Sequence, residues 1–299
     1  MSKNRLVGMA HLPVLTLAVI MVAAPAAIAA TISYYRFEDS PGFLKDSSGN
    51  GYDLTQPNPA SGFQATLPAS GRGSAFPTTI PQTGAANAKA YDVAGVTASP
   101  IQRTFVSPPV AGDFTIEAFV HPDTFNFTDA IFGNSDVNGT AGFAFQARHD
   151  TALGNPADAL FLTVSDTSGG GHFFYSPSST FVLSTGIDYY VAAAFDDTLN
   201  ATTLYLKDLT DNGALQSTTV ILGGTWNMKG YVKYAIGNYS ADTADGGAAF
   251  DGLIDEARLS SGLLPSDQLL ITAPQVIPEP TAVMLFLAGG GFLWWKRRS

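Results

Sequence analysis

Apolar and polar residues alternate along most of this chain with the period of a β-strand. From Phe114 to Val120 the even-numbered residues are all apolar and can share one face, while Thr115, Glu117 and Phe119 share the other. Similar short runs recur between residues 31 and 263, separated by turn-forming clusters, and helix-period patterns are almost absent. This organisation is typical of an all-β sandwich. The predicted strands are 32–37, 114–121, 130–132, 142–148, 159–165, 173–175, 188–195, 202–208, 216–222, 232–236 and 250–259.

Two segments depart from this pattern. Residues 56–90 are rich in Pro, Gly, Ser, Thr and Ala and contain few large apolar side chains. We expect a long surface excursion there. Residues 271–277 have the composition of a linker and separate the predicted domain from the end of the chain.

The last predicted strand contains two adjacent acidic residues. Strict alternation over 250–259 places Asp255 on one face and Glu256 with Arg258 on the other. An unpaired buried carboxylate is costly. We therefore expect these two acidic residues to be either paired or exposed, with Arg258 as the partner of Glu256 and a neighbouring strand supplying another partner.

The C-terminal end has the features of a membrane-engaging tail. It consists of a polar tripeptide, a short apolar run and a cationic end, in the order Pro278, Glu279 and Pro280; residues 281–295; and Lys296, Arg297 and Arg298. A bilayer span needs roughly 20 residues, so this run is short. The alternative, an amphipathic helix that closes a soluble domain, is disfavoured because the run leaves no polar face.

The order of these three parts resembles the PEP-CTERM sorting signal of bacterial exported proteins. The resemblance covers residues 278–299 alone. It implies recognition by a membrane-embedded processing enzyme of the exosortase type, which would remove the tail after transient anchoring in the inner membrane.

The N-terminal end has the features of a secretory signal peptide. Lys3 and Arg5 form a positive region, and an apolar stretch from Leu12 to Val22 precedes the small-x-small pattern of Ala27 and Ala29. We therefore predict a signal peptide over 1–29; a retained first transmembrane helix is the alternative. The domains expected are 1–29, the folded domain 30–270, the linker 271–277 and the sorting signal 278–299.

The charge balance bears on partners. The whole chain carries 15 Lys and Arg against 25 Asp and Glu; without the two ends these fall to 10 and 24, a net charge of about −14. An acidic surface repels phosphate backbones, so nucleic acid is not expected as a partner. The chain contains no cysteine. An exported fold of this kind must rest on its hydrophobic core, with or without a metal.

The folded part resembles the laminin G-like, or concanavalin A-like, jelly-roll family. The likeness extends over about 32–270 and lies in segments 34–39 and 45–51, 113–122, 188–196 and 204–208, and 236–238 and 250–259. It implies a two-sheet antiparallel jelly-roll sandwich.

The resemblance also implies a structural calcium ion between the first strand's loop and the last strand. The ligands would be drawn from Glu38, Asp39, Asp46, Asn50 and Asp255. Carboxylate and amide oxygens suit this hard cation. The alternative is that Asp46 and Asn50 shape a turn and that Asp255 forms an ion pair.

A carbohydrate site would need exposed aromatic rings. Trp226 and Tyr239 lie beside turn residues and are the candidates. Catalysis finds little support: the chain lacks the Glu-x-Asp-x-x-Glu spacing of jelly-roll glycoside hydrolases and a Gly-x-Ser-x-Gly elbow. The function expected is that of an exported, non-enzymatic surface or matrix protein that binds carbohydrate or exopolysaccharide. The alternatives are a divergent polysaccharide hydrolase or lyase, and a structural biofilm or adhesion component.

Overall fold

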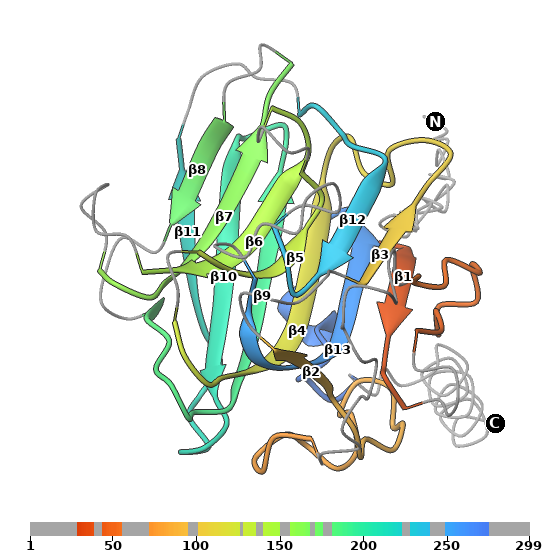
Figure 1. Ribbon diagram of the computed structural model, residues 1–299. Coiled ribbons are helices and arrows are strands. Elements are labelled where there is room, and N and C mark those ends of the chain that lie inside the picture. The colour runs from red at the N-terminus through yellow and green to blue at the C-terminus, as the bar shows by residue number, and fades with distance from the viewer. Residues whose placement is uncertain are drawn as a thin grey trace, which may run out of the picture.

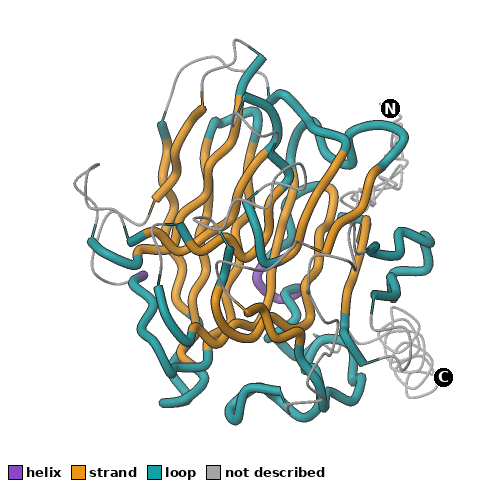
Figure 2. Tube along the Cα trace, in the orientation of Figure 1, coloured by secondary structure: helices purple, strands orange, loops and turns teal. Residues whose placement is uncertain are grey.

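The computed structural model describes residues 29–38, 44–55, 72–94, 101–125, 128–135, 140–149, 156–167, 171–175, 181–222, 228–239 and 249–274. Within these residues two antiparallel sheets pack face to face in a jelly-roll-like arrangement (Figures 1 and 2). None of the helical segments in this described part has the length and apolarity to cross a bilayer. The fold is therefore all-β, as the alternation predicted.

Sheet A contains seven strands among the described residues. Its order is β1 (Thr31–Tyr35), β13 (Asp251–Ser261), β4 (Phe114–Pro122), β9 (Tyr189–Asp196), β10 (Ala201–Asp208) and β11 (Gln216–Ile221), and β2 (Tyr91–Ala94) also pairs with β13. Sheet B has the order β3 (Ile101–Thr104), β12 (Lys233–Ile236), β5 (Asp129–Gly133), β6 (Phe143–Arg148), β7 (Ala159–Ser165) and β8 (Gly171–Tyr175). β1 and β3 are thus edge strands on one side of the sandwich, as Figure 1 shows.

The main hydrophobic core fills the space between the sheets. On β4 the even-numbered residues from Phe114 to Val120 belong to this core, which confirms the predicted alternation. The Phe114 ring stacks on Phe143 of sheet B at a centroid distance of 4.6 Å. Stacked and tilted aromatic pairs of this kind add to the stabilisation that area burial supplies.

A second apolar cluster covers the outer face of sheet A. Phe119 and Tyr190 of the sheet pack there against Phe76 and Ile80 of the segment 72–90 and against Leu269 near the end of the described chain. The prediction of a surface excursion over 56–90 is therefore wrong for 72–90, because Phe76 and Ile80 are buried. The remainder of that prediction lies outside the described residues.

A buried ion pair ties the last described segment to this outer face. Glu117 is fully buried, and its carboxylate accepts hydrogen bonds from Arg258 Nε at 2.6 Å, Tyr190 Oη at 2.6 Å and the Leu270 backbone N–H at 2.7 Å. Arg258 also donates to the Gln268 carbonyl at 2.7 Å. The carboxylate is thus compensated by charge and by hydrogen bonds, as burial requires.

The strand β13 contains a β-bulge that the alternation did not predict. Its register with β4 shifts between Asp255 and Arg258, and Glu256 has a φ of 51°. A bulge adds a residue to one strand and re-aims the side chains next to it. Asp255 and Glu256 consequently both contact the outer layer, where Asp255 bonds to Asn87. The predicted Arg258–Glu256 pair is wrong: Arg258 pairs with Glu117, and Glu256 pairs with Arg36 at 3.2 Å.

Candidate functional site

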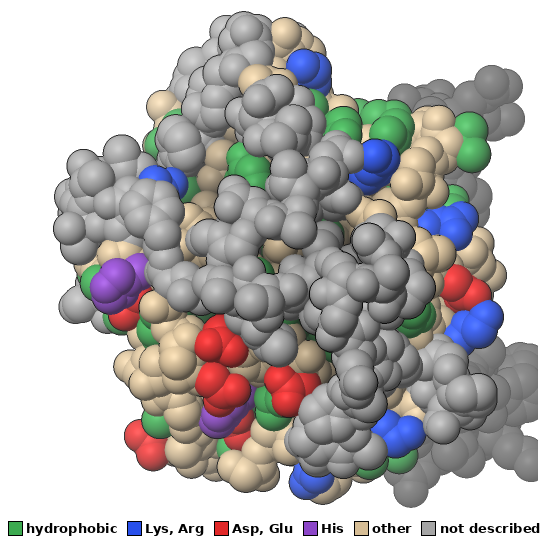
Figure 3. Space-filling model, viewed as in Figure 1, with side chains coloured by type: hydrophobic (Ala, Val, Ile, Leu, Met, Phe, Trp, Pro, Cys, Tyr) green, Lys and Arg blue, Asp and Glu red, His purple; other side chains and the backbone are tan. Residues whose placement is uncertain are grey.

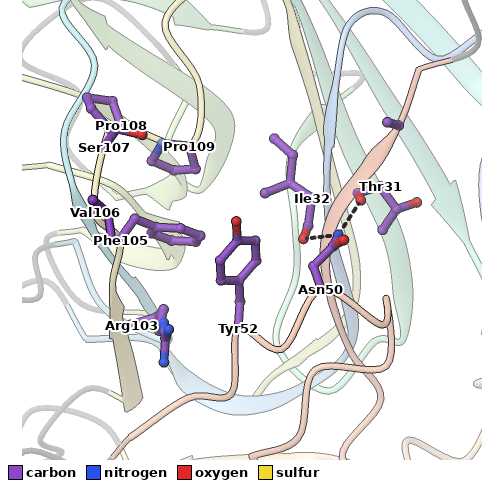
Figure 4. Close-up of a pocket in the computed structure, with 11 residues that line it drawn as sticks. Thr31, Ile32, Asn50, Tyr52, Arg103, Phe105, Val106, Ser107, Pro108 and Pro109 are labelled. Carbon is purple, nitrogen blue, oxygen red and sulfur yellow. Dashed lines mark hydrogen bonds between the residues drawn. The ribbon is translucent and has the colours of Figure 1, made fainter.

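A groove lies between the two sheet edges formed by β1 and β3 (Figure 4). Its volume is about 410 Å³, which is within the usual range for sites that bind small molecules or short polymer segments. It is lined by Ala30, Thr31, Ile32, Asn50, Tyr52, Arg103, Phe105, Val106, Ser107, Pro108 and Pro109.

The loop 44–55 forms the groove by bridging the two edges. At one end the Ser47 N–H bonds to the Tyr34 carbonyl on β1, and at the other Thr55 and Gln102 on β3 exchange backbone hydrogen bonds of 2.7 and 2.9 Å. Because both strands are edges, their free backbone groups are available for this loop. The loop places Tyr52 between the sheets' margins.

Asp46 organises this loop from within. Its carboxylate accepts the backbone N–H groups of Tyr34, Ser48 and Tyr52 at 2.9–3.0 Å and the Ser48 hydroxyl at 2.8 Å. Asn50 donates through Nδ2 to the carbonyls of Thr31 and Ile32, each at 2.9 Å. Short polar side chains that bond nearby backbone are typical turn formers. Asp46 has this role within the loop, whereas Asn50 joins the loop to β1.

Aromatic rings and one cationic side chain line the groove. The Tyr52 ring lies 4.6 Å from Phe105, centroid to centroid, and the Arg103 guanidinium lies 5.7 Å from the Tyr52 ring. In Figure 4 the Tyr52 hydroxyl points away from Arg103, toward Pro109 and Ile32. Val106 at the rim is fully exposed. Such a surface can stack on the C–H face of a sugar and hydrogen-bond its polar edge.

The other predicted calcium ligands lie around Asn87. Asp255 accepts Asn87 Nδ2 at 2.8 Å, and Glu38 accepts the backbone N–H groups of Ala88 and Lys89 at 2.6 and 2.8 Å. Burial, and after it the charge of Glu256, raise the pKa of Asp255 well above its ordinary range. The buried Oδ1 of Asn87 has no hydrogen-bond partner.

The structure thus divides the five predicted calcium ligands. Glu38 and Asp255 are close enough for Glu38 to raise the pKa of Asp255, whereas Asp46 and Asn50 shape the loop 44–55. Asp39 lies outside the described residues. Across the described ranges, no three His, Asp or Glu side chains are arranged to hold a metal by themselves.

Glu256 is a second acid with altered titration in this cluster. It accepts hydrogen bonds from the Tyr34 hydroxyl and from Arg36 Nε at 3.2 Å. Burial raises its pKa to about 7, although these two partners act in the opposite direction. Asp255 and Glu256 thus place two adjacent buried acidic side chains with raised pKa values on the outer face of sheet A, where Arg36 pairs with Glu256.

Of the two aromatic residues predicted for carbohydrate contact, the structure describes Tyr239, which is not among the residues that line the groove. Tyr239 lies three residues after Ile236, which pairs with Ile101 at the start of β3, whereas Phe105 follows the last residue of that strand. Trp226 lies outside the described residues. The sorting and processing residues also lie outside them: Ala27, Pro278, Glu279, Pro280, Lys296, Arg297 and Arg298. Ala29 is described and packs at the margin of the outer apolar cluster.

A histidine–aspartate pair lies at a separate rim, where β4 ends. His121 Nδ1 is 2.6 Å from Oδ1 of the buried Asp188, and His121 Nε2 is 3.5 Å from Asp123. Burial, followed by Asp123 and Asp251, raises the pKa of Asp92. Figure 3 shows acidic side chains gathered beside a histidine on this part of the surface, while basic side chains lie over β3 and β1. Sequence reasoning missed this pair because 67 positions separate its members.

Several solved structures are similar to this chain over part of its length. A carbohydrate-binding module, the CBM40 of a Ruminococcus gnavus IT-sialidase bound to alpha2,3 sialyllactose, is 13% identical over 62% of this chain and 96% of its own, with a TM-score of 0.44. A SAP-like pentraxin from Limulus polyphemus is 12% identical over 62% of this chain and 85% of its own, with a TM-score of 0.40. A putative carbohydrate binding protein from Bacteroides ovatus is 21% identical over 57% and 44%, with a TM-score of 0.38.

No curated protein sequence matches the chain significantly. Residues 94–269 match the Laminin_G_3 family, which is described as the concanavalin A-like lectin/glucanases superfamily. This match extends over more than half of the chain and includes β4 to β13 of the sandwich. The protein therefore belongs to the Laminin_G_3 family of concanavalin A-like domains.

Proposed function

We propose that this protein is an exported, non-enzymatic binding protein that holds a segment of an extracellular polysaccharide in the groove between β1 and β3. The observation that carries the proposal is the combination of the Tyr52 and Phe105 rings with the polar groups of Asn50 and Arg103 in one groove. Apolar walls with a few placed polar groups are the usual composition of ligand sites.

The test is polysaccharide binding by the purified protein, measured by affinity electrophoresis through gels that contain one polymer each. Tyr52→Ala should abolish the retardation, and Tyr52→Phe should keep it, because the ring supplies the contact surface. The Tyr52 carbonyl that accepts the Tyr35 hydroxyl at 2.6 Å is retained in both variants. Tyr205→Ala, at a half-buried tyrosine on the outer face of sheet A, is the control. A wild-type protein that no polysaccharide retards would refute the proposal.

We also propose that a calcium ion stabilises the cluster at Asn87. Asp255, Glu38 and the unpartnered Asn87 Oδ1 offer the carboxylate and amide oxygens that calcium prefers, and backbone carbonyls or water would complete its shell. Burial and the charge of Glu256 raise the pKa of Asp255, and a cation bound there would favour its ionised form. Calcium should raise the melting temperature, EDTA should lower it, and Asp255→Asn should remove the difference. Equal melting temperatures in calcium and EDTA would exclude the ion.

The ends of the chain complete the proposal. The signal peptide predicted over 1–29 would direct secretion, and the sorting signal predicted over 278–299 would engage the inner membrane and an exosortase-type enzyme. The protein would then act at the cell envelope, at the outer surface or outside the cell. The tail supports this route through its Pro-Glu-Pro motif, apolar run and basic end.

A lyase is the second candidate, favoured by the His121–Asp188 pair. A buried carboxylate that orients a histidine through Nδ1 leaves Nε2 to accept a proton. Asp123 lies 3.5 Å from that nitrogen. Release of unsaturated or reducing ends from polysaccharides, lost in His121→Ala but kept in Tyr52→Ala, would establish this activity. Absence of release from neutral and acidic polymers would exclude it.

A further inference from the structure

We infer that the groove selects polysaccharides that carry acid groups, with the Arg103 guanidinium binding a carboxylate or a sulfate ester. The inference rests on the proposed function and names the class of its ligand. Among the described residues that line the groove, Arg103 is the only charged one. Its presence there runs against the composition of the chain between the two predicted processing sites, where acidic residues outnumber basic ones by 24 to 10.

Arg103 retains unused hydrogen-bonding capacity. A guanidinium has five N–H donors. In the described structure Nη1 donates to the Asp53 carbonyl at 3.3 Å, whereas the buried Nε has no partner. The nearby Asp53 carboxylate is engaged by Lys45 at 2.5 Å and by the Asp46 N–H at 3.0 Å. Arg103 thus donates to a neutral carbonyl, and although the Lys45 hydrogen bond and, after it, the charge of Arg103 help to lower the pKa of Asp53, the Nε–H of Arg103 remains unpaired and able to bind a ligand.

The position of Arg103 is set before any ligand arrives. Its backbone is fixed by the pairing of β3 with β12, in which Arg103 lies opposite Tyr234. Its guanidinium lies over the Tyr52 ring. A guanidinium that stacks on an aromatic face still presents its edge, and that edge matches the two oxygens of a carboxylate or sulfate. Such preorganisation lowers the entropic cost of binding.

The remaining groove suits the sugar that would carry the acid group. Both protons of Asn50 Nδ2 are occupied by the carbonyls of Thr31 and Ile32, which leaves Oδ1 to accept from a sugar hydroxyl. The Tyr52 hydroxyl lies on the side of its ring away from Arg103 (Figure 4). An acidic sugar can thus direct its charged group to Arg103 and its hydroxyls to the opposite end.

Because the protein carries a negative net charge, the binding of an acidic polysaccharide would indicate a specific site rather than general electrostatic attraction. A domain of about −14 repels acidic polymers at long range. Attraction must therefore come from a local site. The Arg103–ligand contact should be screened only in part by salt, because Arg103 is half-buried and its Nε is buried.

The experiment compares three polymers with the same backbone: dextran, carboxymethyl-dextran and dextran sulfate. Dissociation constants are measured for the purified protein and for Arg103→Gln. The wild type should bind one or both charged polymers more tightly than dextran, and the preferred polymer distinguishes a carboxylate site from a sulfate site. Arg103→Gln should lose about 10- to 100-fold of that affinity, as expected for a charge-assisted bond, with dextran binding unchanged.

Arg148→Gln is the matched control. Arg148 also lies over an aromatic ring, that of Phe161 at 5.6 Å, and it belongs to β6 of the same sheet but lies outside the groove. Its affinities should equal those of the wild type, and Arg103→Lys should keep part of the charged-polymer affinity. Equal wild-type binding of dextran and its charged derivatives, or full retention of that affinity in Arg103→Gln, would overturn the inference and leave the proposed function standing. Failure to bind any polysaccharide would refute the proposed function itself.

Discussion

Replacing Arg258 with Met should destabilise the folded protein by about 3 kcal/mol, because it leaves the Glu117 carboxylate buried without its counter-charge. The Glu117 side chain is only 1% exposed and that of Arg258 10%. Breaking such a pair typically costs about 3–5 kcal/mol. The lower end applies because Tyr190 and Leu270 continue to donate to the carboxylate at 2.6 and 2.7 Å. Methionine keeps the apolar volume of the arginine stem, so the loss of stability measures the missing charge rather than lost packing.

The assay is thermal and denaturant unfolding of the variant beside Lys45→Met. Lys45 forms an ion pair with Asp53 in which both side chains are largely exposed, at 59% and 38%. Exposed pairs contribute about 0–1 kcal/mol. For a domain of this size, 3 kcal/mol corresponds to a melting temperature lowered by about 6–12 °C. If Arg258→Met lowers the free energy of unfolding by no more than Lys45→Met does, the Glu117 carboxylate is in contact with water. Residues 262–272 then do not cover the outer face of sheet A.

Three further predictions concern titration, the loop and processing. Burial raises the pKa of Glu256 to about 7 from an ordinary 4.5, so the folded state binds this proton more tightly than the unfolded chain, and stability is lost as pH rises between these values. In EDTA, the melting temperature of the wild type should therefore fall more between pH 5 and 7 than that of Glu256→Gln. Parallel curves of melting temperature against pH would contradict this. Asp46→Ala removes four hydrogen bonds within and beside the loop 44–55, so it should lower the free energy of unfolding by about 3 kcal/mol, equally in calcium and in EDTA. The variant should also lose polysaccharide binding. A loss of stability seen only in calcium would make Asp46 a metal ligand. Intact-mass analysis of protein from its host should show a chain that begins at Ala30, which lines the groove, and ends at Pro280, whereas a retained Trp295 would make the tail a permanent anchor.

Local sequence pattern sufficed for most strands but not for their irregularities. The alternation on β4 is confirmed because its even-numbered residues from Phe114 to Val120 belong to the main core, whereas Phe119 packs in the outer cluster. On β13 the same argument failed, since the bulge at Asp255 and Glu256 breaks the period of two. A positive φ at a glutamate has no marker in sequence, as it depends on the partner strands and on the Asn87 and Tyr34 contacts.

β2 and β3 were not predicted because each has only four residues and is extended mainly through its pairing with a neighbouring strand, β13 for β2 and β12 for β3. β3 consists of Ile101, Gln102, Arg103 and Thr104, with one strongly apolar residue, and it is placed by β12 and by Thr55. The groove depends on this strand and on Tyr52, which lies 50 positions from Gln102 in the chain. Its composition could therefore not be assembled from sequence spacing. An available indication was the Phe105-Val106 pair before two prolines, where an exposed valine marks the rim.

The candidate ligands illustrate the same limit. Acidic and amide side chains near the first and last strands were recognised, yet the structure assigns Asp46 and Asn50 to the loop and gathers Glu38 and Asp255 at Asn87. Asn87 lies within the segment that its composition indicated as surface. The composition of a segment indicates only the average exposure of its residues. The segment 72–90 is held on the outer face of sheet A by a few buried side chains, such as those of Phe76 and Ile80.

Hydrogen exchange of the backbone amides, with and without a saturating polysaccharide, tests the central claim most directly. The account predicts slower exchange in residues 45–55 and 103–107, the two segments that meet at Tyr52 and Arg103. Protection at the rim around His121 and Asp92, with no change in the loop 44–55 and after β3, would contradict it and move the binding site to the acidic end of the sandwich.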